Sequence, residues 1–103
     1  MNTRAFTPRS DSTVNIDVSS SSQSAKVCDD NGDVDVRVMN NGSATAWIKF
    51  GASGLTADTT NDIPVGPGVT EVLRAPPLGG ALYVAVIAAG STGKIYFTPG
   101  SGI

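Results

Sequence analysis

The chain has 103 residues and a net charge of −2, from seven Lys or Arg and nine Asp or Glu residues, with no histidine. This length suits a single domain. The basic residues are scattered and form no clustered patch, which excludes nucleic acid as an expected partner. Twelve glycines, six prolines and an apolar fraction of 40% favour short strands and turns over helices.

Cys28 is the one cysteine of the chain, so it has no partner for an internal disulfide. Without a histidine to activate its thiol, we expect it to pack as a small apolar side chain rather than act as a nucleophile. A thiol without a partner favours folding in a reducing cytoplasm.

No stretch of the sequence predicts a membrane span or an export signal. The longest apolar run, Ala81–Ala89, is far shorter than the roughly 20 residues that a spanning helix needs. The opening MNTRAFTPRSDS lacks the apolar core of a signal peptide. We therefore expect no membrane association and no export by the general secretory pathway.

Residues 1–12 carry Arg4, Phe6 and Arg9 without any periodicity. Such a terminus fits either a frayed end or an extended arm, in which Phe6 anchors on a neighbouring subunit. We divide the chain accordingly into an extended N-terminal arm, residues 1–12, and a β-sandwich domain, residues 13–103.

The stretch from 34 to 50, VDVRVMNNGSATAWIKF, has the clearest pattern of the chain. Three valines at every second position alternate with Asp35 and Arg37, which is typical of a strand with one buried face. A second alternating run, from 45 to 50, follows Asn41-Gly42, a pair that favours a type I′ turn. The pattern therefore predicts a β-hairpin.

Other alternating or apolar runs predict further strands, and no helical periodicity of useful length appears. The Ser-rich segment 19–24 and the proline-containing segment 75–80 are expected connections, and the prolines of the irregular segment 63–68 exclude it from a central strand. We expect an all-β fold, a single β-sandwich or jelly-roll-like barrel of seven to nine short, mainly antiparallel strands. Besides the hairpin, the expected strands are 14–18, 25–28, 55–57, 69–74, 81–87 and 94–98.

The acidic turn between Asp29 and Asp35 raises the question of a calcium site. Its spacing differs from that of an EF-hand, and Asp-Asn-Gly-Asp also suits a tight turn for conformational reasons. We predict no metal site and no cofactor. The sequence has no P-loop, nucleophile elbow or zinc spacing, so it predicts a protein that is not an enzyme.

Aromatic residues are the best candidates for partner binding, because interface cores are enriched in them. Trp47, on the strand face opposite Ala46 and Ile48, fits either a second layer of core or a docking surface, and Tyr83 and Tyr96 present the same choice. An exposed aromatic ring also stacks on sugars, which keeps a carbohydrate-binding module open. The candidate partner-binding residues are Arg4, Phe6, Arg9, Trp47, Tyr83 and Tyr96.

Four segments of the chain resemble small structural proteins encoded among the head genes of tailed bacteriophages. They are RAFTP, VRVMNNGSATAWIKFG, IPVGPGVTEVL and the C-terminal YFTPGSGI. The resemblance implies a β-sandwich protein of the virion, of the capsid decoration or cement type. It carries no catalytic motif and assigns no role to any residue.

The resemblance further implies that the protein is assembled onto the capsid surface in the host cytoplasm and stabilises the head. Its partners would be the major capsid protein, across whose subunit junctions it binds, and copies of itself in a homodimer or homotrimer. A neck, tail or baseplate component of the virion is an alternative. A carbohydrate-binding module displayed on the particle is another.

Overall fold

The structure, a computed structural model, describes residues 6–9, 11–29, 34–77, 79–90 and 93–101. All regular secondary structure in these ranges is β-strand, as the sequence predicts, and the strands form two antiparallel sheets packed as a sandwich. No helix of the described residues has the length and apolar character that a membrane crossing needs.

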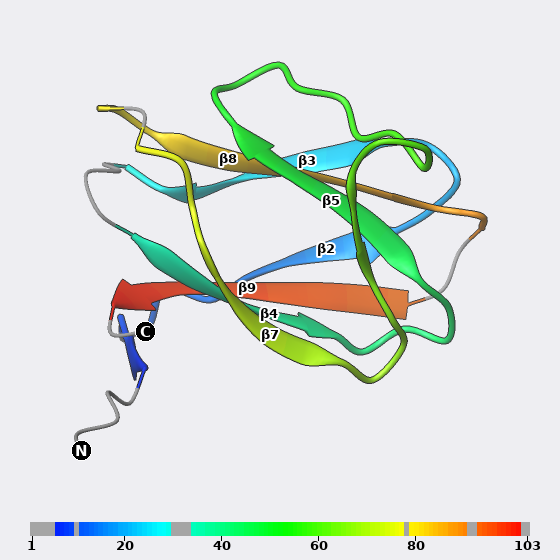
Figure 1. Ribbon diagram of the computed structural model, residues 1–103, viewed down its shortest axis with the longest axis horizontal. Coiled ribbons are helices and arrows are strands. Elements are labelled where there is room, and N and C mark those ends of the chain that lie inside the picture. The colour runs from blue at the N-terminus through cyan, green and yellow to red at the C-terminus, as the bar shows by residue number, and fades with distance from the viewer. Residues whose placement is uncertain (1–5, 10, 30–33, 78, 91–92, 102–103) are drawn as a thin grey trace.

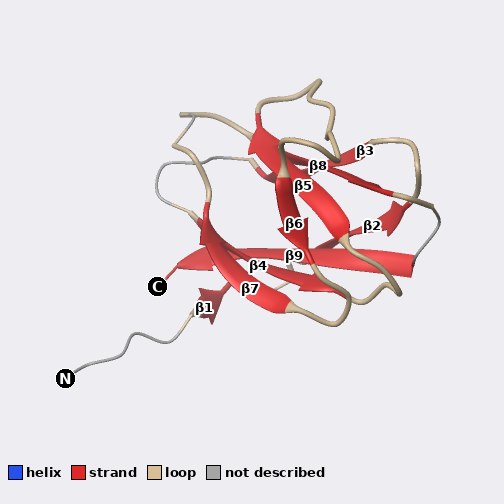
Figure 2. Ribbon diagram, turned by 45° about the vertical axis from the view of Figure 1, so that its right-hand side comes forward, coloured by secondary structure: helices blue, strands red, loops and turns tan. Residues whose placement is uncertain are grey.

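The sandwich consists of a five-stranded and a four-stranded sheet (Figures 1 and 2). In the five-stranded sheet, β1 and β2 both pair with β9, which is followed by β4 and β7; in the four-stranded sheet, the order is β3-β8-β5-β6. The strands are β1 (Thr7–Pro8), β2 (Val14–Val18), β3 (Gln23–Cys28), β4 (Asp35–Asn40), β5 (Ala46–Gly51), β6 (Ile63–Val65), β7 (Thr70–Arg74), β8 (Leu82–Ala88) and β9 (Gly93–Ser101).

The core lies between the two sheets and is built from the inward residues of each alternating strand. Phe97 is its largest fully buried side chain, and its ring meets that of Phe50 edge to face, with centroids 6.3 Å apart. Other fully buried residues are Val36 and Val38 of β4, Ile48 of β5, Val84 and Val86 of β8, and Ile95 of β9. Burying each such side chain contributes about 1.5–3 kcal/mol.

The predicted hairpin between 34 and 50 is wrong, although both of its strands exist. β4 pairs with β7 and β9, and β5 pairs with β6 and β8, so the two strands belong to different sheets. Neither Asn41 nor Gly42 has a positive φ, so the pair does not adopt the type I′ conformation. The Asn-Gly segment instead carries the chain from one sheet to the other.

The expected strand at 55–57 is also wrong, because this segment belongs to a long loop between β5 and β6. The loop lies outside the four-stranded sheet (Figure 1). It reaches the start of β3, where the Ala57 amide donates a hydrogen bond to Ser22 Oγ at 2.9 Å. A second hydrogen bond ties the loop to β5, since Lys49 Nζ donates to the Thr56 carbonyl at 3.1 Å. Ala85, on the outward side of β8, is fully buried, and its register partner on β5 is Lys49, which bonds to this loop.

Pro99 lies inside β9, where the edge pairing changes from β2 to β1. Its carbonyl accepts a hydrogen bond from the Arg9 amide at 2.9 Å, so this side of the residue faces the N-terminal segment. The N–H and C=O of one strand residue point to the same side, so the position at which proline lacks an N–H is on the side of the break between β1 and β2. The ladder with β4 is therefore preserved.

Candidate functional site

The two lateral sides of the sandwich, where the edge strands of the two sheets face one another, differ: one is closed and the other is open. On one side, β6 and β7 are joined directly in sequence, and the fully buried Asn40 connects the sheets. The Asn40 amide donates to the carbonyl oxygens of Val65, at 2.9 Å, and Ala44, at 3.0 Å, while its side-chain oxygen accepts from the Gly42 amide at 2.9 Å. This network closes the sandwich at β6 and β7.

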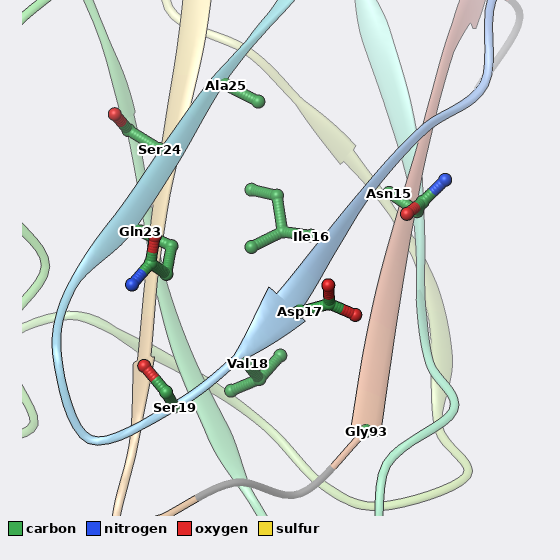
Figure 3. A pocket seen from close by; sticks show the side chains of 9 residues that line it. All are labelled: Asn15, Ile16, Asp17, Val18, Ser19, Gln23, Ser24, Ala25 and Gly93. Carbon is green, nitrogen blue, oxygen red and sulfur yellow. The ribbon is translucent and has the colours of Figure 1, made fainter.

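On the opposite side, the edge strands β2 and β3 diverge from the turn at 19–22 and leave a groove of about 610 Å³ between them (Figure 3). Ile16 of β2 and Ala25 of β3 point toward one another across it, whereas Asn15 and Ser24 point away (Figure 3). The groove thus has an apolar floor and polar margins. Its lining residues are Asn15, Ile16, Asp17, Val18, Ser19, Gln23, Ser24, Ala25 and Gly93.

A second hollow, of about 470 Å³, lies further along the same two strands. Arg9, Asp11 and Val14 line it from the side of β2, and Lys26 and Cys28 line it from the side of β3. Cys28 is half-buried and packs against the core, in agreement with its expected apolar role. Together the two hollows follow one edge of the sandwich, where each edge strand offers backbone groups for pairing.

Exposed ion pairs flank this edge. Lys26 Nζ lies 2.5 Å from the Asp29 carboxylate, and this hydrogen bond raises the pKa of Lys26 and lowers that of Asp29. Lys94 Nζ lies 2.7 Å from the Asp17 carboxylate, which raises the pKa of Lys94 through the hydrogen bond and the opposite charge. Charges on edge strands limit unspecific strand pairing.

The described residues contain no group of three or more His, Cys, Asp or Glu side chains arranged to hold a metal ion. Within the acidic turn considered for calcium, positions 30–33 lie outside the described residues. The carboxylates at its two ends are engaged elsewhere: Asp29 pairs with Lys26, and the buried Asp35 lies 3.3 Å from Arg74 Nε.

Two of the three N-terminal candidates, Phe6 and Arg9, lie along the end of β9. Phe6 is half-buried and packs closely on Gly100. A Cβ added at Gly100 would lie 2.7 Å from the Phe6 ring. Arg9 is exposed and lines the second hollow. Arg4 lies outside the described residues.

Trp47 and Tyr83 lie on the outward face of the four-stranded sheet, because their strand neighbours are buried in the core. Trp47 is half-buried and stands in register with Ile87 of β8 and Pro64 of β6. Tyr83, also half-buried, is in register with Lys26 of β3. Trp47 is therefore not a residue of the core between the sheets.

Tyr96 lies on the outward face of the other sheet, on β9, so the structure separates it from Trp47 and Tyr83. It is in register with Met39 of β4, and Thr98 is in register with Arg37. Sequence reasoning did not nominate Arg37 or Met39 as site residues. The alternation of β4 placed both on its outward face, but nothing in the sequence paired that face with Tyr96.

Neither a family model nor a curated protein matches the chain. Among solved structures, that of PirA is similar over 88% of this chain and 95% of its own, with a TM-score of 0.58 and 16% sequence identity. A chain from disulfide-linked pili, the endospore appendages of Bacillus, covers 99% of this chain and 92% of its own, at 18% identity and a TM-score of 0.46. At these identities the PirA similarity describes the fold alone, and the pilus similarity is too low to support a conclusion.

Proposed function

We propose that this chain is a non-enzymatic structural protein of a tailed-bacteriophage virion, of the capsid decoration type. In this function it binds across junctions between major capsid subunits and adds association free energy that opposes the internal pressure of packaged DNA. Interfaces of ordinary size bury about 1,200–2,000 Å², so many modest contacts sum to substantial stabilisation of the shell. The sequence resemblance to phage head proteins is the origin of the proposal.

The structural observation that carries the proposal furthest is the open edge between β2 and β3. An extended segment of a neighbouring protein can add to such an edge, because backbone hydrogen bonds supply affinity and the groove between the strands receives its side chains. The half-buried Ala25 offers apolar contact for that segment, above the buried side chains of Ile16 and Val18. The ion pairs of Asp17 with Lys94 and of Lys26 with Asp29 select against unspecific partners.

Blocking the groove tests this mode of attachment. Gln23 lies at the margin of the groove, is exposed, and is in register with the inward-facing Val86, so Gln23→Trp places a large side chain over the groove without altering the core. Thr70→Trp adds the same bulk to β7, on the closed side of the sandwich. We expect the unmodified chain and Thr70→Trp to sediment with purified phage heads that lack the protein, and Gln23→Trp to bind weakly.

Equal binding of the two variants would exclude the groove as the attachment site, and absence of binding by the unmodified chain would contradict the proposed function itself. We also propose that residues 1–12 contribute contacts. A chain that lacks them is expected to occupy fewer sites on the head, and unchanged occupancy would contradict this part.

A further inference from the structure

A hollow of about 370 Å³ lies on the outward face of the five-stranded sheet, away from the groove. This volume is at the lower end of the range of small-molecule sites. It lies over β4 and β9, which occupy the middle of the sheet and are paired on both sides. Its lining residues are Thr13, Arg37, Met39, Asn41, Tyr96 and Thr98.

The hollow combines an apolar platform with hydrogen-bonding groups. Tyr96 and Met39 are in register on neighbouring strands, and 38% of Met39 is exposed, an unusual exposure for a large apolar residue of a central strand. Beside them, the hydroxyls of Thr13 and Thr98 share a hydrogen bond of 2.9 Å, and each retains capacity for another. Asn41, exposed at the end of β4, offers both a donor and an acceptor.

Arg37 supplies the charge of the hollow. Its side chain is exposed and forms no ion pair with any residue that the structure describes. Two carboxylates on the same face are already paired, Asp17 with Lys94 at 2.7 Å and Asp35 with Arg74 at 3.3 Å. A guanidinium in this situation is suited to bind a carboxylate of a ligand through two parallel hydrogen bonds.

We propose that this hollow binds an acidic sugar, the carboxylated terminal residue of a glycan. The C–H face of the sugar ring packs on Tyr96 and Met39, the carboxylate binds Arg37, and ring hydroxyls bond to Asn41 and the threonine pair. Tyr96 and Met39 belong to central strands of the sheet, so binding immobilises few groups of the protein and costs little conformational entropy. This site does not depend on membership of the virion.

The basic residues around the hollow favour a sugar over a nucleic acid as its ligand. Of the basic residues near the hollow, Lys94 is already bound to Asp17, which leaves Arg37 to meet an anion. A single guanidinium matches a single carboxylate, whereas a phosphate backbone requires several basic contacts. An extended peptide is better received by the groove at the sandwich edge.

Titration with sialyllactose and with lactose tests the proposal, because the two saccharides differ by the acidic sugar alone. The titration is followed by the amide resonances of isotopically labelled full-length chain. We expect sialyllactose to bind at concentrations up to about 10 mM and to shift resonances around Tyr96, and lactose to bind at least about tenfold more weakly. Arg37→Gln should remove this preference, and Tyr96→Ala should weaken binding of both saccharides.

Tyr83→Ala is the matched control, since Tyr83 is a half-buried tyrosine on the outward face of the other sheet. Its affinity for sialyllactose is expected to equal that of the unmodified chain, and thermal melting confirms that each variant folds. The exposed Arg37→Gln variant keeps the test decisive if Tyr96→Ala is unstable. Absence of sialyllactose binding, equal affinity for lactose, or unchanged binding by Arg37→Gln would each overturn the proposal.

Discussion

The side-chain amide of Asn40 donates a hydrogen bond of 2.9 Å to the carbonyl oxygen of Val65, which lies in the opposite sheet. Both residues are fully buried. The bond joins the end of β4 to the end of β6, next to the segment where the chain passes between the sheets. One polar side chain therefore closes one side of a sandwich whose other side is open.

Replacing Asn40 by alanine is expected to lower the free energy of unfolding by about 2–4 kcal/mol, because buried backbone groups lose their partners. Asn41→Ala, at the exposed neighbouring position, should change it by less than about 0.5 kcal/mol. Urea denaturation of the two variants measures the difference. Equal stabilities would mean that water replaces the Asn40 side chain and that the network does not hold the sheets together.

Gly100→Ala is expected to release the N-terminal segment from β9. The added Cβ would lie 2.3 Å from the Thr7 carbonyl oxygen and 2.7 Å from the Phe6 ring, and the Thr7 contact is with backbone, which cannot rotate away. We expect the free energy of unfolding to fall by about 1–3 kcal/mol and amide exchange at residues 6–9 to become faster. Gly80→Ala, where a Cβ meets nothing within 4 Å, is the control. Unchanged exchange in Gly100→Ala would contradict the packing of Phe6.

The ion pair between Lys26 and Asp29 gives a pH dependence of known sign. The Asp29 pKa is lowered from 3.8, so its contribution to stability is present above that pH and is lost as the pH falls through the folded-state pKa. The Lys26 pKa is raised from 10.5, so its contribution is present below 10.5 and is lost as the pH rises through the folded-state pKa. Both groups are exposed, so the effect on stability is small.

Carboxyl NMR titration measures this pair directly. In Lys26→Gln, the pKa of Asp29 should return toward 3.8, because its hydrogen bond and its opposite charge are both removed. The pKa of Asp58 is lowered mainly by the backbone amide of Thr60 and should not change. An Asp29 pKa that stays low in the variant would show that another group holds it.

Local alternation predicted the strands but not their partners. The runs at 14–18 and 94–98 were correct because a residue's face in a strand depends on its immediate neighbours. The hairpin at 34–50 was wrong because Asn-Gly also suits a passage between sheets, and Asn40 selects that passage through a bond to Val65, 25 residues away. A turn pattern of two neighbouring residues carries no information about such a long-range contact.

The candidate sites depend on that same long-range pairing. The segment 81–87 is apolar on both faces, and its outward residue Ala85 is fully buried beside Ser24 and Lys49, which belong to strands distant in the sequence. The hollow at Tyr96 requires β9 to lie beside β4, strands more than fifty positions apart in the chain. The groove requires β2 and β3 to be edges of different sheets. Each side chain could be assigned a face from the sequence, but not its neighbours.

The number of copies per virion tests the proposed function most directly. Under the proposed function, quantitative mass spectrometry of purified virions gives the ratio of this chain to the major capsid protein. We predict a ratio near one to one or a simple fraction of it, as for a protein that covers the shell. About a dozen copies or fewer, the number in a single ring, would instead place the chain in the neck or tail. Its absence from the virion would contradict the account.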